Sequence, residues 1–208
     1  MKHTFLLLLL FYTTHNHLIA QTSEEKSMGE YVSGQINKFS SLGAGKAQGL
    51  KIHCKYPKSW ESIAGERPHI IRKFIQSDGS GTVMSMIMVN KQEQELTQEE
   101  IAEFMTTEGL KSIIGNATYI ASNCNLKIEG LKAGSIEYAR SDVRGDQTFY
   151  SYNLDYLFPY KQYLISLQFM VIDKVGETKE SLYNRYKKAK PLFAMMFNSI
   201  VIDNIWEK

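Results

Sequence analysis

Along most of the chain, apolar and polar positions alternate with a period that predicts either a strand or a helix. Between Leu50 and Tyr56 every second residue is apolar, which is the period of a strand with one buried face. The segment 82–89 (TVMSMIMV) is apolar at nearly every position, which predicts a central strand covered on both faces. Five further strands are predicted, at about 69–76, 117–129, 133–143, 147–158 and 161–172.

Helical spacing of three and four residues occurs in three places. The segment 22–39 carries it near the beginning of the chain. Thr97, with Glu100 three residues later, has the pattern of a capping box, so a second helix is expected to begin there. A third helix is expected from Thr178, and Pro191 predicts that it is kinked or restarts. The apolar residues of the first segment are Met28, Val32, Ile36 and Phe39.

Together these elements predict an α+β protein with an antiparallel sheet of about six to seven strands flanked by helices. The short joints between the last strands favour antiparallel neighbours, because a parallel connection needs a long crossover. A chain of 208 residues is long enough for one self-sufficient core. We expect a signal peptide at 1–20, an N-terminal extension with a helix and a linker at 21–48, and a single domain at 49–208.

The N-terminal segment has the three-part layout of a secretory signal peptide. Lys2 supplies a basic start, Phe5–Tyr12 is an unbroken apolar run, and Leu18–Ala20 precedes the expected cleavage site ahead of Gln21. The apolar run is too short to cross a bilayer, which takes about 20 residues, and no later segment reaches that length. The sequence therefore predicts an exported protein, periplasmic or extracellular, with no transmembrane segment in the mature chain.

Charge and histidine content argue against several classes of function. Lysine and arginine number 24 against 22 acidic residues, so the basic excess expected of a nucleic-acid-binding protein is missing. After removal of the signal peptide only His53 and His69 remain, and their spacing matches none of the usual zinc patterns. Gly43–Lys46 resembles the end of a phosphate loop, but Ala47 follows where Ser or Thr would bind magnesium. We expect no metal, no cofactor and no enzymatic activity.

The segment GLKIHCKYPKSW combines alternating apolar residues with Tyr56, Pro57 and then Trp60. This order resembles the opening strand of PsbP-like and DcrB-like domains. The helix start Leu96–Glu100 (LTQEE), the run of later strands and the closing helix are also similar. The resemblance covers residues 49–202.

The resemblance implies an α/β/α sandwich around an antiparallel sheet, and a non-enzymatic accessory or binding role. It makes Tyr56, Pro57 and Trp60 structural positions. The partner implied by such a role is another protein of the cell envelope, and the alternative is a small-molecule ligand. An exposed apolar patch would favour the protein partner, whereas a concave pocket would favour the ligand.

Two cysteines, Cys54 and Cys124, lie on the apolar faces of two predicted strands. Export would place them where a disulfide can persist. If their strands are close neighbours, a bridge would close a long loop and stabilise the fold by roughly 4 kcal/mol. The alternative is two separately buried thiols, because free cysteine behaves as a small hydrophobe.

Tyrosines are concentrated in the last two predicted strands. Tyr150 and Tyr152 share one strand face, and Tyr163 begins a similar face on the next strand. Such a stripe predicts a cleft between sheet and helix for a small ligand, because the ring is apolar and its hydroxyl is polar. The alternative is an ordinary sheet core, in which aromatic residues are common.

Overall fold

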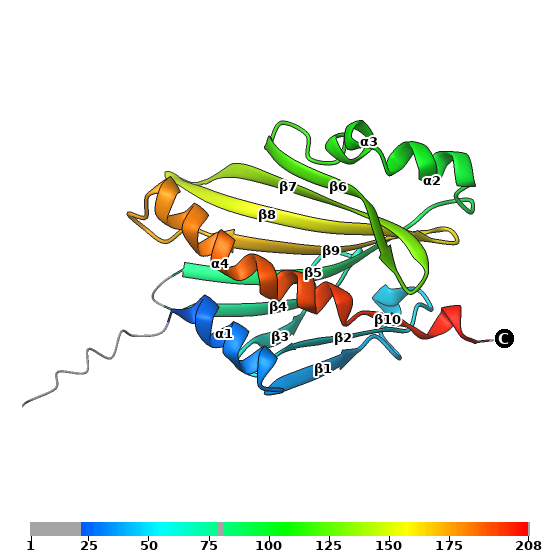
Figure 1. Ribbon diagram of the computed structural model, residues 1–208, viewed down its shortest axis with the longest axis horizontal. Helices are drawn as coiled ribbons and strands as arrows, with labels where there is room; N and C mark the ends of the chain where they lie inside the picture. The colour runs from blue at the N-terminus through cyan, green and yellow to red at the C-terminus, as the bar shows by residue number, and fades with distance from the viewer. Residues whose placement is uncertain (1–21, 79–80, 208) are drawn as a thin grey trace, which may run out of the picture.

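The computed structural model describes residues 22–78 and 81–207 (Figure 1). The signal peptide predicted for residues 1–20 lies outside the described residues. The described part consists of two antiparallel sheets and four α-helices, which confirms the predicted fold class. None of the helices in this part is long and apolar enough to cross a membrane.

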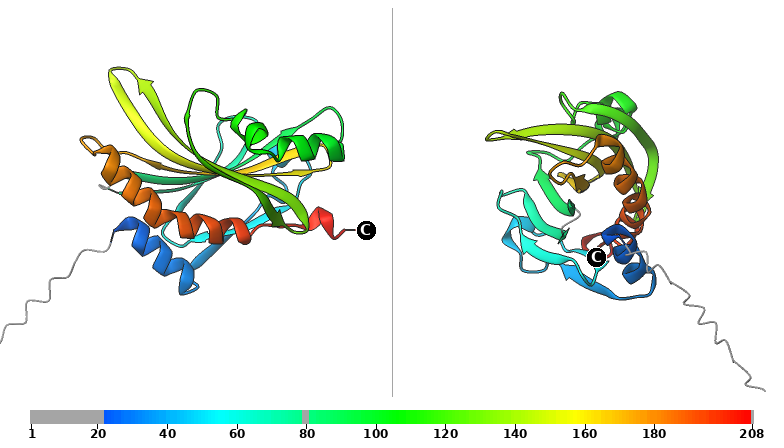
Figure 2. Two further views of the ribbon diagram at one scale, coloured as in Figure 1. Left: turned by 45° about the horizontal axis from the view of Figure 1, so that its top comes forward. Right: turned by 90° about the vertical axis from the view of Figure 1, so that its left-hand side faces the viewer.

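The larger sheet has seven strands in the order β3-β4-β5-β9-β8-β7-β6, and every neighbouring pair in it is antiparallel. Figure 2 shows that the sheet is strongly twisted. β3 is an edge strand that the sequence pattern does not predict. The bounds are β3 (Glu61–Ala64), β4 (Ile70–Asp78), β5 (Gly81–Lys91), β6 (Thr118–Ile128), β7 (Leu131–Arg144), β8 (Gln147–Tyr160) and β9 (Tyr163–Ile172).

The smaller sheet brings the two ends of the described chain together. Its central strand is β2, which pairs with β1 on one side and β10 on the other. β1 belongs to the segment 21–48, so this predicted extension is hydrogen-bonded to the first strand of the predicted domain. The bounds are β1 (Ile36–Ser40), β2 (Ile52–Pro57) and β10 (Val201–Ile202), with short 3-10 helices η1 (Gly45–Ala47) and η2 (Asp203–Ile205) nearby.

The first predicted helix is shorter than its apolar spacing suggests. α1 spans Ser23–Val32 and begins with a capping box between Thr22 and Glu25. Gly34, with a φ of 77°, turns the chain out of the helix. Ile36 and Phe39 therefore lie in β1, and the prediction that they belong to the helix is wrong. Pairing with β2 decides the conformation of this segment.

One face of the large sheet is covered by α4 (Lys179–Asn198), which runs across it and packs beside α1 (Figure 1). The helix continues through Pro191 and does not restart there. Aromatic rings from the sheet and the helix interlock in the core between them. Tyr156 stacks on Phe197 with ring centroids 4.1 Å apart, and Phe169 stacks on Phe193 at 4.5 Å.

Among the described residues, helices cover the opposite face of the sheet only near β6 and β7. Two short helices, α2 (Gln98–Phe104) and α3 (Thr107–Lys111), stand where the sequence predicts one helix. Thr106 separates them, because its hydroxyl caps α3. Gly134 on β7 lets them approach closely, since a Cβ there would lie 3.1 Å from a Leu110 methyl carbon. The second core cluster formed here consists of Met105, Leu110, Ile114, Ile136, Tyr138 and Leu157.

Candidate functional site: a methionine-lined groove

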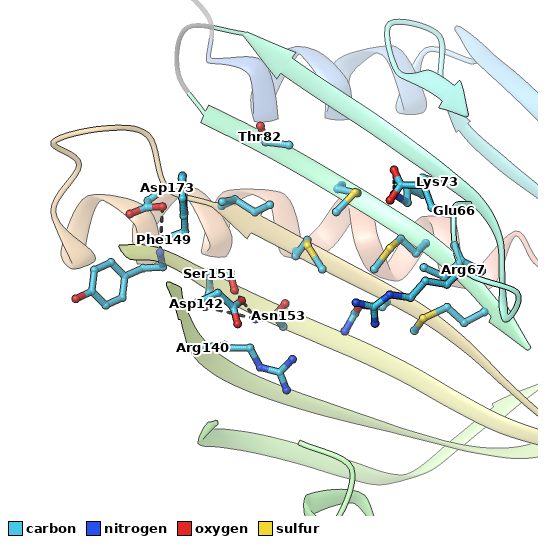
Figure 3. Close-up of a pocket in the computed structure, with 18 of the residues that line it drawn as sticks. Glu66, Arg67, Lys73, Thr82, Arg140, Asp142, Phe149, Ser151, Asn153 and Asp173 are labelled. Carbon is cyan, nitrogen blue, oxygen red and sulfur yellow. Dashed lines mark hydrogen bonds and ion pairs between the residues drawn. The ribbon is translucent and has the colours of Figure 1, made fainter. Parts of the chain in front are cut away.

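The part of this face that α2 and α3 leave uncovered forms a groove of about 780 Å³. Its floor comes from β5, β8 and β9, and its walls come from β4 with the preceding loop on one side and from β7 on the other (Figure 3). α4 lies behind the sheet in this view, so the groove is separated from the main core by the sheet itself. Its volume is in the range of about 300–1,000 Å³ that is typical of small-molecule sites.

Methionine side chains make up much of the floor. Met84, Met86 and Met88 alternate along β5 and therefore point to the same face. Met170 lies directly opposite Met84 on β9. Met86 is buried, and the other three are half-buried. The prediction that 82–89 is covered on both faces is therefore wrong for this face, where the groove leaves the thioethers partly open.

Charged side chains line the rim. Arg67 comes from the loop before β4, and Arg140 comes from β7 on the opposite wall (Figure 3). Lys73 on β4 is paired with Glu66, with its Nζ 3.1 Å from a carboxylate oxygen. Within residues 22–78 and 81–207, neither of the two arginines forms an ion pair.

A cluster of polar side chains lies where the groove meets the helices α2 and α3. Asn153 and Gln168 line the groove. The Gln168 side-chain amide donates to the Tyr138 hydroxyl at 2.7 Å and to Asp155 Oδ2 at 3.2 Å, and the Tyr138 hydroxyl donates to the same oxygen at 3.1 Å. Among the described residues, Asp155 Oδ1 has no hydrogen-bond partner. Asp155 on β8 is only 6% exposed and does not line the groove, although Gln168, which donates to it, does.

Burial strongly perturbs this carboxyl group. Desolvation raises the pKa of Asp155 to about 7, against the lowering effects of the hydrogen bonds from Gln168 and Tyr138 and of the charge on Arg140. Burial also raises the pKa of the Tyr138 hydroxyl, and the neighbouring Asp155 adds to that effect. The cluster is therefore a neutral or singly charged network, depending on pH.

A pH dependence of stability follows from Asp155. Because folding raises the pKa of Asp155 to about 7, the folded protein keeps a proton that the unfolded chain has released. The stabilisation is complete below the ordinary pKa of about 4 and is lost as the pH rises through 7, so the free energy of unfolding should fall by about 2 kcal/mol between pH 5 and 7. Asp155→Asn, which mimics the protonated form, should lack this decrease. Denaturant titrations of both proteins at pH 5 and pH 7 test this prediction. An equal decrease in the free energy of unfolding in the wild type and in Asp155→Asn would contradict it.

The predicted tyrosine cleft lies on the other face of the sheet and is filled. Tyr152 packs against Tyr183 and Tyr186 of α4, with ring centroids 5.0 and 5.6 Å apart. The Tyr163 hydroxyl donates to the backbone carbonyl of Gln48 at 3.0 Å. Of the three predicted lining residues only Tyr150 reaches the groove, at its end. Tyr152 and Tyr163 therefore belong to the sheet core and its edge, which is the alternative interpretation of the stripe.

The two cysteines are not brought together. Cys54 on β2 is buried in the main core on the α4 side, and Cys124 on β6 packs against the second cluster on the groove side. Both are free thiols, so the structure contains two separate thiols in place of the disulfide. Burial raises the pKa of the Cys54 thiol to about 12, which makes it unreactive. The Cys124 sulfur lies 3.8 Å from the Thr107 hydroxyl.

The two histidines and the lysine of the glycine-rich fragment lie in different parts of the structure. His53 Nε2 lies 2.6 Å from a carboxylate oxygen of Asp203, whereas His69 lines the groove. Among the described residues, no group of His, Cys, Asp and Glu side chains could hold a metal ion. The ammonium group of Lys46 donates to the backbone carbonyls of Gly65, Glu66 and Arg67, so the lysine of the phosphate-loop-like fragment holds the loop before β4.

The fold and the groove define an α+β protein with a ligand-sized site on an open sheet face. Comparison with protein-family models gives no match, and no curated protein matches the chain. The resemblance to PsbP-like and DcrB-like domains therefore stays a prediction.

Two solved structures show a distant likeness. LpqN of Mycobacterium tuberculosis, described as involved in cell envelope biogenesis, is 10% identical with a TM-score of 0.46, over 85% of this chain and 96% of that one. A protein from Bacteroides thetaiotaomicron VPI-5482 is 14% identical with a TM-score of 0.42, over 84% of this chain and 51% of that one. Neither likeness is close enough to carry an argument about function, which we draw from the groove.

Proposed function

We propose that this is an exported, non-enzymatic binding protein that holds a small-molecule ligand in the methionine-lined groove. The observation that carries the proposal is the groove itself: a hollow of about 780 Å³ on the part of the sheet face that α2 and α3 leave uncovered. The groove combines a methionine floor with many polar and charged side chains around it. Ligand sites likewise combine apolar surface with placed polar groups that orient the ligand. Export is supported by the N-terminal sequence pattern alone.

The methionine floor suits a binding role. Thioether side chains are flexible and polarizable, so they adapt to the shape of an apolar ligand and are common on surfaces that bind such ligands. The floor is also rigidly supported, because β5 and β9 pair along ten consecutive positions and are backed by the main core. A ligand would therefore meet a fixed sheet with adaptable side chains.

A binding role is also supported by the position of the perturbed carboxyl group. Asp155 is engaged by Tyr138 and Gln168, is buried and does not line the groove, so a ligand on the methionine floor would not contact it directly. Its raised pKa is therefore explained by burial. Structural burial perturbs pKa values as readily as catalytic sites do.

Native mass spectrometry tests this function on mature protein purified gently from the cells that make it. We expect extra mass on the folded protein that is released on denaturation. The double variant Met84→Gln/Met170→Gln makes the floor polar and should lose that mass. The matched control Met84→Leu/Met170→Leu keeps the floor apolar, at a cost in stability below about 1.5 kcal/mol per site, and should retain it.

The competing function is an accessory role, in which another envelope protein covers this face. Val143 on the groove rim is largely exposed and could contribute to such a contact. A bare wild-type monomer that cross-links to an envelope protein through this rim would contradict the ligand-binding function and support the accessory role.

A further inference from the structure

We propose that the ligand of the groove is an anionic amphiphile, whose acyl chain lies on the methionine floor and whose carboxylate or phosphate head lies between Arg67 and Arg140. This inference rests on the proposed binding function and names the class of ligand. It follows from three features of the groove: two guanidinium groups that form no ion pair among the described residues, their positions on opposite walls, and the apolar surface below them.

The charge pattern leaves the two arginines available. Among the described residues, Arg67 and Arg140 form no ion pair, whereas the third cation of the groove, Lys73, is already paired with Glu66. A guanidinium presents a fork of N–H donors that matches a carboxylate or a phosphate, and such charge-assisted bonds are about twice as strong as neutral ones. Two guanidinium groups on opposite walls, neither of which forms an ion pair within the described part of the chain, therefore favour an anion between them.

Neighbouring groups hold the side chain of Arg140 and the backbone of Arg67. The guanidinium of Arg140 lies 5.4 Å from the centroid of the Tyr138 ring and donates to the Ile114 carbonyl at 3.2 Å. The backbone of Arg67 is fixed because Lys46 donates to its carbonyl and to those of the two residues before it. The fixed guanidinium of Arg140 lowers the entropy cost of binding an anion. Figure 3 shows the two side chains entering the groove from opposite walls.

The groove also contains carboxylates, which would repel the anionic head group and so limit where it can bind. Asp173 accepts a hydrogen bond from the backbone N–H of Tyr150 at 3.0 Å, at the end of β8 and β9. Asp142 lies two residues beyond Arg140 on β7 and is exposed to water. Arg140 lies at the same end of the groove as these carboxylates, because it pairs with Ser151 and Ser151 pairs with Ile172, next to Asp173. The head group is therefore placed on the side of Arg140 that faces Arg67, away from Asp142 and Asp173.

An apolar chain distinguishes this ligand from a free anion. Met84 to Met88 spans four residue steps along β5, which is about 14 Å. The half-buried thioethers along this length would lose their contact with water under an acyl chain. Each buried methylene should strengthen binding about fourfold. An inorganic anion would gain nothing from this floor.

The test is titration calorimetry of the mature protein with decanoate, decyl phosphate, uncharged 1-decanol and inorganic phosphate. We expect both anionic amphiphiles to bind at least tenfold more tightly than decanol, and inorganic phosphate to bind more weakly still. Arg67→Gln, at an exposed side chain, should weaken the anionic ligands about tenfold and leave decanol unchanged. Lys132→Gln removes the same charge at an exposed position outside the groove and should have no effect.

The possible outcomes separate the inference from the function on which it rests. If decanol binds as tightly as decanoate and Met84→Gln/Met170→Gln abolishes both, the groove is a ligand site but the anionic class is wrong. If inorganic phosphate binds as tightly as decyl phosphate, the apolar chain contributes nothing to binding, and the proposal that the ligand is an amphiphile is wrong. Binding that the methionine variant leaves unchanged would place the ligand elsewhere and overturn both. Decanoate and decyl phosphate are compared to show which head group, fatty acid or phosphate ester, is preferred.

Discussion

Trp60→Ala is expected to lower the free energy of unfolding by about 3–5 kcal/mol, which is the usual cost of removing a large buried aromatic side chain. Trp60 is 3% exposed and packs in the main core, where its removal leaves a cavity. Its indole N–H also donates to the Ser27 hydroxyl at 2.8 Å, which joins the turn after β2 to α1. The variant would therefore leave a buried hydroxyl of α1 without its donor.

Chemical denaturation of the purified variant measures this loss. Trp206→Ala provides a matched control, because Trp206 is 68% exposed and its N–H donates to an exposed carboxylate of Glu129. Removal of Trp206 should cost less than about 1 kcal/mol. A Trp60→Ala protein that unfolds like the wild type would show that this side chain is not part of the core.

Local patterns predict the fold where the partner of a segment is close along the chain. The alternation at 50–56 corresponds to β2, and the capping box at Thr97 and Glu100 begins α2. Tyr56 and Trp60, which the resemblance marks as structural, are both buried. The strand at 50–56 and the helix start at Thr97 are predicted correctly because side-chain period and helix capping depend on neighbours within a few residues.

Long-range pairing decides the segments that the sequence pattern misassigns. The three-residue spacing of Ile36 and Phe39 fits a helical face, whereas in a strand the two side chains point to opposite faces. Only the pairing of β1 with β2 selects the strand. β10 is two residues long and exists because it adds to the other edge of β2. Neither partner can be inferred from hydrophobic period, since register across a sheet is set by tertiary contacts.

The position of the groove depends on what covers each face of the sheet. The alternation of Met84, Met86 and Met88 is visible in the sequence and places the three on one face. Coverage is not visible there: α2 and α3 end over β7 and leave those methionines open, whereas α4 supplies the rings that fill the predicted tyrosine cleft. The tyrosine pattern therefore places the predicted ligand site on the sheet face that α4 covers, whereas the groove lies on the opposite face.

A buried ion-pair cluster ties α1 and α4 to the loop that follows β9. Arg185 on α4 donates from Nε to Glu24 of α1 and from Nη1 to Glu177, each at 2.8 Å. Both carboxylate side chains are 1% exposed, and the arginine side chain is 11% exposed. Taking one cation and two carboxylates out of water is costly, so the arrangement depends on every member being present.

Arg185→Met is accordingly expected to lower the free energy of unfolding by about 3–5 kcal/mol, because it leaves two buried carboxylates without their cation. The triple variant Arg185→Met/Glu24→Gln/Glu177→Gln should recover much of this loss, since it removes the uncompensated charges while the packing volume is largely kept. Lys188→Met breaks a neighbouring exposed pair with Glu25 and should cost less than about 1 kcal/mol. Denaturant titration of the three proteins measures these differences. Equal losses for Arg185→Met and Lys188→Met would show that the buried cluster stabilises the α1–α4 contact no more than a surface ion pair does.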